Sequence, residues 1–454
     1  MTSASEKKAK IPSIFSSSYA TILEESIHNK HPHHFLKIRR QNEQAEGLWR
    51  IRDELYDLSN FKHPGGKIWM ELTKGLDITE SYLTSHRQEY PEILKKYHVR
   101  PAKRPRQTPF TFEEDGFYMT LKRRVKPILD NVGTGPSVAT NLMTDATLTF
   151  FLVMFLLAGI YQNTIFAISS GLALGCLIGV SHNYSHQRVQ LKAYYVDFTC
   201  FSSVEWRIIH VLSHHLFPNT VQDLEVTLMN DVVDFFVHQK TAFYKWISPV
   251  LIFAVAPFAV PFEAIKRFSA ILQGRQKFRP ENSIILIEFL IMFALTGWSF
   301  LTALKLWTVV HMGSSVLMIF QQWGNGHHHP EVYHDGDIPR GETFDYGLYQ
   351  VDCCRERPEF MLDPYIVLIM FSHHTLHHLF PTVDHSKLPY LYPVLAETLR
   401  EFDQSFRMIS YLKCAQGMVQ QIRKETPTPL SVRQRKSNEI FHLDEDFLNK
   451  VVPT

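Results

Sequence analysis

Three groups of histidines lie beside long apolar stretches of this chain. The groups are His182 and His186; His210, His214 and His215; and His374, His377 and His378. Within each group, histidines three or four residues apart share one face of a helix, so their imidazoles can converge on one region. Imidazole is a good ligand for iron. One such pair alone is more often structural, but three groups beside membrane-length segments indicate a membrane protein that holds iron with histidines.

Two apolar regions must position these histidines. Residues 142–180 and 283–320 carry few charges, and each region is interrupted once, at 161–163 and at 297–301. At about 1.5 Å of rise per residue, each half of the first region is only just long enough for one crossing of a bilayer. Basic residues flank the outer ends of both regions, which places those ends in the cytosol. The sequence therefore predicts two transmembrane hairpins with all three histidine groups on the cytosolic side.

A third apolar run, residues 248–262, lies between the second and third histidine groups and contains Pro257 and Pro261. If this run crossed the bilayer, the two groups would face opposite sides of the membrane. We therefore expect it to be interfacial or re-entrant. Residues 365–371, just before the third group, are too few to cross and are expected to lie along the membrane face.

The overall charge is nearly balanced, with 47 Lys and Arg against 45 Asp and Glu. No basic field indicates a nucleic-acid partner, and none is predicted. The five cysteines follow no disulfide framework, and the adjacent pair Cys353–Cys354 differs from a zinc CxxC knuckle, so we expect reduced thiols that face the cytosol. The amino terminus lacks the long apolar core of a cleaved secretory signal. Residues 423–439 are predicted to be a mobile polar tail.

A different motif precedes the apolar regions. The turn His63-Pro64-Gly65-Gly66 is followed by GLDIT at 75–79 and by a second histidine, His86. This stretch resembles the cytochrome b5 haem-binding domain over residues 35–100. The resemblance implies an α+β fold in which His63 and His86 are the axial ligands of haem b. Iron capped on both faces by imidazole has no open position for oxygen, so such a centre carries single electrons. Five apolar residues are expected to line the crevice: Ile68, Trp69, Leu72, Leu76 and Ile78.

The three histidine groups have the sequences HNYSH, HVLSHH and HTLHH, and the third is followed directly by Leu379-Phe380-Pro381. With the hairpins, they resemble the membrane fatty acid desaturase family over residues 141–403, and the fusion behind a haem domain resembles the front-end acyl desaturases. The resemblance implies an all-α membrane domain with a cytosolic histidine-box cap and two non-haem iron ions. It also implies a fatty acyl substrate, dioxygen, NADH-cytochrome b5 reductase as the electron source, and the endoplasmic reticulum membrane. Outside these two domains, we expect a polar tail at 1–34, a linker at 101–140, and a carboxyl-terminal helix with a polar tail at 404–454.

Two positions depart from the family pattern. Front-end desaturases have glutamine where this chain has His374, whereas acyl-CoA desaturases have histidine there. Asn183 replaces the aspartate of many relatives within the first group, which changes the surroundings that orient a histidine. Neither change removes a ligand.

A ninth ligand is expected from the run His327-His328-His329, whose register the family pattern does not set; we choose His328. Nine nitrogens for two irons leave room for an open position at each, as oxygen activation requires. Asn325 is expected either to hold a water on iron or to form a turn. Asp223, Glu225 and Asp384 either orient imidazoles or are ordinary surface acids.

Other histidines have no box spacing. His311, inside the fourth apolar segment, is either a pathway residue or, as we expect, a hydrogen-bond partner between helices. We expect the remaining ones to be solvated or structural: His28, His31, His33, His34, His238, His334, His373 and His385.

These features predict a desaturase fused to its electron donor. A hydroxylase is a close variant, because the same oxidant can return oxygen to the carbon. The alternative interpretation is a membrane haem protein without catalytic activity, which carries electrons or binds lipid. The enzyme requires about two non-haem irons per haem and the carrier requires none.

Overall fold

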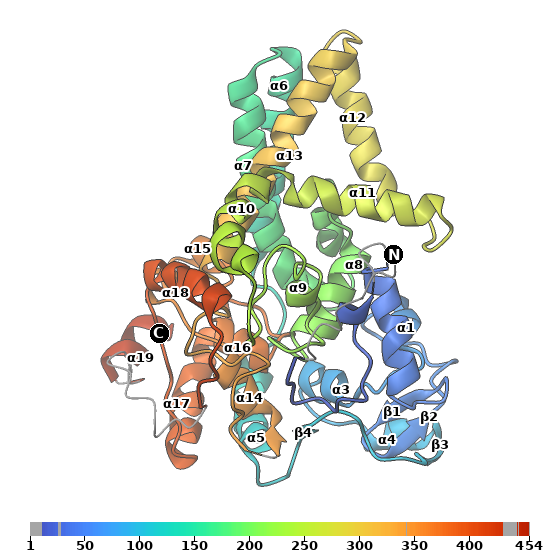
Figure 1. The fold of residues 1–454 in the computed structure, drawn as a ribbon, viewed down its shortest axis with the longest axis vertical. Helices are drawn as coiled ribbons and strands as arrows, with labels where there is room; N and C mark the ends of the chain where they lie inside the picture. Colours follow the sequence, from blue (N-terminus) through green and yellow to red (C-terminus); the bar gives the residue numbers. More distant parts are fainter. Residues whose placement is uncertain (1–10, 26–28, 342, 430–442, 444, 454) are drawn as a thin grey trace, which may run out of the picture.

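The computed structural model describes residues 11–25, 29–341, 343–429, 443 and 445–453. Long apolar helices extend from one end of the molecule, and the histidine-bearing segments lie at their base (Figure 1). The amino-terminal part, blue in Figure 1, lies beside this base on one side.

The amino-terminal part has the α+β fold that the sequence predicts. Its antiparallel sheet has the order β1 (Trp49–Ile51), β2 (Glu54–Tyr56), β3 (His98–Pro101). Four helices surround it: α1 (Pro32–Asn42), α2 (Lys67–Thr73), α3 (Thr79–Ser85) and α4 (Pro91–Lys95). Three short strands bury too little to be stable alone. Their core is completed by α1, α3 and, from the histidine-box part, by Ile208 and Leu212.

Part of the segment predicted to be a polar tail packs against the rest of the protein, although several of its described residues are exposed. Phe15 and Tyr19 are buried, and the Tyr19 hydroxyl donates to Glu43. His31 caps α1 by accepting the backbone N–H of His33. The prediction for His28 falls outside the described residues. Apolar side chains within a mostly polar stretch therefore suffice to fix this segment.

The first predicted hairpin is present as α6 (Val138–Ile160) and α7 (Thr164–Ser185), with Asn163 capping α7 at the predicted break. The second is α12 (Ile284–Leu295) and α13 (Phe300–Trp323). A Cβ atom on Gly171 would lie 2.4 Å from the carbonyl oxygen of Val310. This glycine therefore lets α7 and α13 approach closely, as small residues do in membrane helices.

Among the described helices, four are long and apolar enough to cross a membrane: α6, α7, α13 and the bent helix at 243–272. The bent helix contains α10 (Ser248–Val255) and α11 (Ala259–Leu272) around Pro257, and α11 lies across the base of the long helices (Figure 1). That this segment is interfacial or re-entrant stays a prediction. The bounds of α12 agree with the predicted first arm of the second hairpin, which starts near Ser283 and ends before the break at 297–301. Its twelve residues rise about 18 Å, less than the bilayer core of about 30 Å.

The remaining elements surround the histidine boxes. Strands β4 (Phe110–Thr111) and β5 (Phe344–Asp345) pair in parallel. The predicted linker contributes α5 (Phe117–Val132), whose Tyr118 and Leu121 belong to the largest hydrophobic core, so this stretch is structural rather than a spacer. The other helices are α8 (Ser203–Trp206), α9 (Leu224–Thr227), α14 (Tyr346–Cys353), α15 (Pro364–Ile369), α16 (His374–Leu379), α17 (Tyr392–Glu401), α18 (Tyr411–Arg423) and α19 (Glu445–Val451). Most of the predicted mobile tail, from residue 430 onward, lies outside the described residues.

Candidate metal centre and haem crevice

The local fold of each histidine group explains how its imidazoles converge. The first group lies at the end of α7, where His182 and His186 are one turn apart. The second lies in a π-helical segment, Arg207–His214, and its last member, His215, ends that segment. The backbone N–H of His215 bonds to the carbonyl of His210 at 2.9 Å. This wider turn, often found at functional sites, brings residues five apart onto one face. The third group lies along α16. The side chains of all eight histidines in the three groups are buried.

Five imidazoles form one cluster at the base of α7. Its members, whose ligand atoms lie within 4.8 Å of one another, are His182, His186, His210, His215 and His377. The Nε2 atom of His182 is 2.6 Å from that of His210 and 3.2 Å from that of His377. Three segments far apart in the sequence thus present nitrogen atoms to one small region.

A second cluster lies next to the first. It contains His327, His374 and His378 together with Cys354, again within 4.8 Å of one another. The Nε2 atom of His214 joins it, at 3.1 Å from the Nε2 atom of His327. Two clusters of buried imidazoles, side by side, fit a pair of metal ions.

The hydrogen bonds around His327 and His374 provide a stricter test of this fit. The Nδ1 atom of His327 lies 2.9 Å from the carbonyl of Cys353, and that of His374 lies 3.0 Å from the carbonyl of Phe371. A carbonyl only accepts, so each Nδ1 carries the hydrogen and each Nε2 presents a lone pair. The two Nε2 atoms nevertheless face each other in direct contact. Two lone pairs at this separation repel unless they share a cation, so this donor set fits a bound metal.

Burial and neighbouring imidazoles lower the pKa of His186, His215, His327 and His378 well below the usual value. These rings are therefore neutral, which is the state that binds a metal. His214 differs. Burial disfavours its charge, but the carboxylates of Glu225 and Asp223 outweigh this effect and raise its pKa to about 9.

Partners outside the clusters orient several rings. The Nδ1 atoms of His210 and His214 lie 2.5 and 2.9 Å from carboxylate oxygens of Glu225 and Asp223 respectively. These two acids therefore orient imidazoles, one of the two roles left open by the sequence. The Nδ1 atom of His378 donates to Gln350 Oε1 at 3.0 Å, and no motif in the sequence indicated this partner.

Asp384 and Asn183 contact each other rather than a box imidazole. The Asn183 amide donates to Asp384 at 2.6 Å, and Thr140 donates to the other oxygen of the same carboxylate at 3.1 Å. This network ties the start of α6 and the end of α7 to the loop after the third box. The aspartate that many relatives have at position 183 would place a second negative charge beside Asp384, so asparagine suits this pairing.

The choice of His328 as the ninth histidine of the cluster is corrected by the structure. His328 points away from the cluster: its ring stacks on Phe235 at 3.7 Å between centroids and its Nδ1 atom lies 3.1 Å from His334. The neighbouring His327 enters the cluster instead. The cause is the turn at Gly326, which has φ +90° and is followed by a hydrogen bond from the His327 backbone N–H to Asn325 Oδ1 at 3.0 Å. Asn325 therefore has the turn role.

The other histidines are structural contacts. His311 Nε2 lies 3.4 Å from Glu288 on α12, so the two helices are in contact there, but this pair does not form the predicted hydrogen bond. His238 lies 2.7 Å from Asp234, and His373 lies 3.2 Å from the Tyr392 hydroxyl. His385 is buried and stacks beside His377, with its Nδ1 atom 3.0 Å from the carbonyl of Ser372.

A cavity of about 960 Å³ opens between His63 and His86 in the amino-terminal part. Their ring centroids are 5.9 Å apart, and His86 Nδ1 donates to the Tyr82 carbonyl at 2.9 Å, leaving Nε2 free. Two metal–nitrogen bonds of about 2 Å each, with the two rings, give a centroid separation of about 6 Å. The pair therefore fits the axial ligands of one iron. Trp69 and Ile78 line the cavity as predicted, whereas Leu72 and Leu76 are buried in the core beside it.

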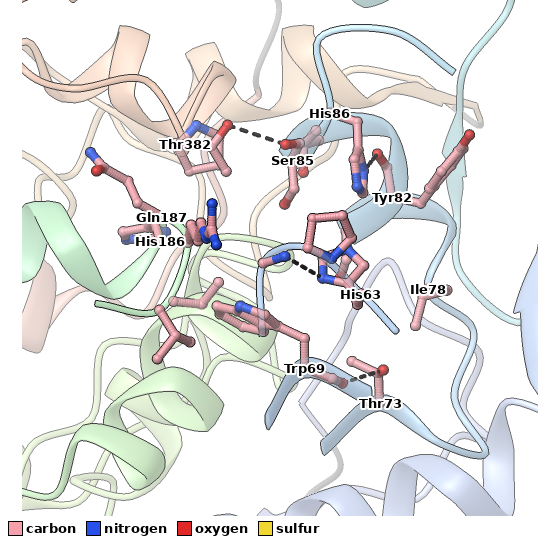
Figure 2. A pocket seen from close by; sticks show the side chains of 18 of the residues that line it. His63, Trp69, Thr73, Ile78, Tyr82, Ser85, His86, His186, Gln187 and Thr382 are labelled. Atoms are coloured by element: carbon pink, nitrogen blue, oxygen red, sulfur yellow. Dashed lines mark hydrogen bonds between the residues drawn. The ribbon is translucent and has the colours of Figure 1, made fainter. Parts of the chain in front are cut away.

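The same cavity reaches the first metal cluster. Figure 2 shows His186 and Gln187 on the wall opposite His63 and His86, and His215 also lines this wall. The two parts are held together by direct bonds, with Val189 N–H donating to Gly65 O at 2.9 Å and Thr382 donating to Ser85 O at 3.2 Å. The haem crevice and the metal cluster thus share one cavity rather than being joined by a flexible tether.

Gly66 is where the haem-domain turn meets the histidine-box part. It has φ +120°, and a Cβ atom there would lie 2.8 Å from Val189 Cγ2. We expect Gly66→Ala to separate the two parts and to slow reoxidation of the haem by the metal centre about tenfold, measured by stopped-flow absorbance with substrate and oxygen. Gly47→Ala is the control, because Gly47 also has a positive φ (+79°) but no neighbour within 4 Å of an added Cβ. Equal slowing in both variants would contradict the docking role and leave only backbone strain.

Comparison with known proteins agrees with both parts. The family model described as fatty acid desaturase matches residues 161–410, and that described as cytochrome b5-like heme/steroid binding domain matches residues 36–103. The chain is 33% identical to the "Cytochrome b5-related protein" of Drosophila melanogaster over 87% of this chain and 92% of that protein. It is 22% identical to "Acyl-lipid (8-3)-desaturase B" of Dictyostelium discoideum over 81% of this chain and 88% of that protein. No solved structure gives a significant match. With two histidine clusters beneath its apolar helices and a bis-histidine crevice beside them, the chain belongs to the fatty acid desaturase family and carries an amino-terminal cytochrome b5-like haem-binding domain.

Proposed function

We propose that this protein is a membrane-bound, oxygen-dependent acyl-lipid or acyl-CoA desaturase that receives electrons from its own haem domain. The observation that carries this proposal is the shared cavity, in which His63 and His86 lie on one wall and His186 and His215 on the other. A fused carrier is useful to an oxidase only if its haem lies near the metal centre, and the docked turn at Gly65 supplies that proximity.

Nine histidines are proposed to hold two irons. They are His182, His186, His210, His214, His215, His327, His374, His377 and His378. His63 and His86 are proposed as the axial ligands of haem b. Iron bound by the nine would supply the oxidant that removes two hydrogens from an unactivated acyl carbon pair. The chain's own contribution is to bury all nine rings, to exclude water, and to orient five of the rings through Nδ1 bonds, those of His210, His214, His327, His374 and His378.

The membrane arrangement is part of this proposal. Helices α6 and α13 expose large apolar side chains that a soluble protein would bury, and those on α6 are Val138, Leu142, Phe150, Leu152, Val153, Leu156 and Ile160. We infer that both hairpins enter the endoplasmic reticulum membrane from the cytosol, because basic residues flank their bases. NADH-cytochrome b5 reductase, which is cytosol-facing in this scheme, would reduce the haem. The fatty acyl chain would enter from the lipid, and dioxygen would be the terminal oxidant.

Expression of the full chain in cells of defined lipid composition tests the function. We expect a new double bond in cellular fatty acids, detected by gas chromatography and mass spectrometry, and about two non-haem irons per haem in the purified protein. His377→Ala should remove the product while leaving the haem spectrum unchanged. A hydroxylated product would identify the hydroxylase variant, and haem as the sole bound iron would leave only an electron carrier or lipid-binding protein.

A further inference from the structure

Cys354 lies inside the second metal cluster. It follows the end of α14, is 2% exposed, and its sulfur lies within 4.8 Å of the donor atoms of His327, His374 and His378. A nitrogen and a sulfur on opposite sides of one ion are about 4.4 Å apart, from bonds of about 2.1 and 2.3 Å. The distance from the Cys354 sulfur to these nitrogen atoms is therefore close to the distance between two ligand atoms of one ion.

The backbone holds this sulfur in place. The Arg355 N–H donates to the Gly326 carbonyl at 3.0 Å, and a Cβ atom on Gly326 would lie only 2.2 Å from the Arg355 carbonyl oxygen. The carbonyl of Cys353 accepts from His327 Nδ1 at 2.9 Å. Residues 353–355 and the turn before His327 are thus clamped together. The clamp fixes Cys354 relative to the ring that enters the cluster.

The neighbouring cysteine points elsewhere. Cys353 Sγ lies 3.6 Å from the carbonyl oxygen of Pro218 and is not part of the metal-binding group. Cys354 has an extended backbone, with φ −125° and ψ 151°, in which successive side chains point to opposite sides. Two adjacent buried thiols therefore have different surroundings, and only one faces the imidazoles.

We propose that Cys354 is a sulfur ligand of the metal ion held by His327, His374 and His378, an inference that rests on the proposed diiron function. The bond forms between the metal and the thiolate, and the thiol proton is released to solvent as the ion binds. A thiolate is a softer and more strongly donating ligand than imidazole. The two ions would then differ, one with nitrogen ligands alone and the other with nitrogen and sulfur.

X-ray absorption of the cobalt-substituted protein tests this ligand directly. Full-length, haem-containing protein in detergent is loaded with cobalt(II) in place of the non-haem iron and measured at the cobalt edge, where haem iron is silent. We expect a sulfur shell at about 2.3 Å with an average of about one sulfur per two cobalt ions. Cys354→Ala should lose this shell, and Cys353→Ala should keep it unchanged.

The outcomes separate this inference from the function. Two bound cobalt ions without a sulfur shell in the unaltered protein would overturn the role of Cys354 and leave the diiron proposal standing. Failure to bind cobalt, with product formation also absent, would overturn both. If Cys354→Ala does not fold, Cys354→Ser supplies an oxygen of similar size; loss of the sulfur shell with cobalt retained would support the proposal, and persistence of the shell would overturn it.

Discussion

His327→Ala is expected to abolish desaturation, with at least about a 100-fold loss of product, because removing only an outer partner of a metal ligand already costs about 10–100-fold. His327 contacts three rings of the second cluster, His214, His374 and His378. Its loss should release the ion held there and lower the non-haem iron content from about two toward about one per haem. Product is measured by gas chromatography and iron by elemental analysis, each per haem.

His328→Ala is the matched control, since His328 is adjacent to His327 and partly buried but packs against Phe235 and His334. Its removal costs packing and should lower stability by about 1–3 kcal/mol without loss of iron. Haem absorbance normalises for the amount of folded protein. Retained iron in His327→Ala combined with lost iron in His328→Ala would refute the assignment of the ninth ligand.

His63→Ala is expected to stop turnover driven by NADH, by at least about 100-fold, while leaving about two non-haem irons in place. The variant removes one of the two rings that face each other across the cavity, so haem is no longer held from both sides. The Soret absorbance reports the loss of haem, and product formation with NADH and reductase reports the loss of electron supply.

His98→Ala is the control for this variant. His98 lies in β3 of the same domain, and its exposed side chain bonds to Glu54 and lies beside the Tyr56 ring. It is not among the residues that line the cavity, so haem and turnover should be unchanged. Addition of separate reduced cytochrome b5 should restore part of the turnover in His63→Ala if the metal centre is intact. Full NADH-driven turnover without bound haem would contradict the proposed electron route.

The histidine boxes and the haem turn were predictable because their geometry is local. Histidines three or four residues apart meet on any helix, so His182 with His186 and His374 with His378 needed only the correct secondary structure. The break between α6 and α7 was predictable for a similar reason, because Asn163 both interrupts an apolar run and caps a helix. The family resemblance then supplied the haem fold.

Two features could not be predicted from local pattern. The role of Asp384 depended on which side chain it meets across about 200 residues, and it meets Asn183. The packing of residues 11–25 depended on a core formed mostly by distant segments, including Tyr346 and Phe217.

The amino-acid sequence by itself determined the chemistry of this protein: which residue types are present, how each short group is spaced, and that a haem turn precedes a histidine-rich membrane part. Only the tertiary structure decided that His327 rather than His328 enters the cluster, that Cys354 stands beside it, and that the haem cavity opens onto His186. The physical reason is that helical spacing fixes neighbours within about one turn, whereas a choice between adjacent side chains in a turn depends on which distant segments pack against it. Here the clamp between Gly326 and Arg355 makes that choice.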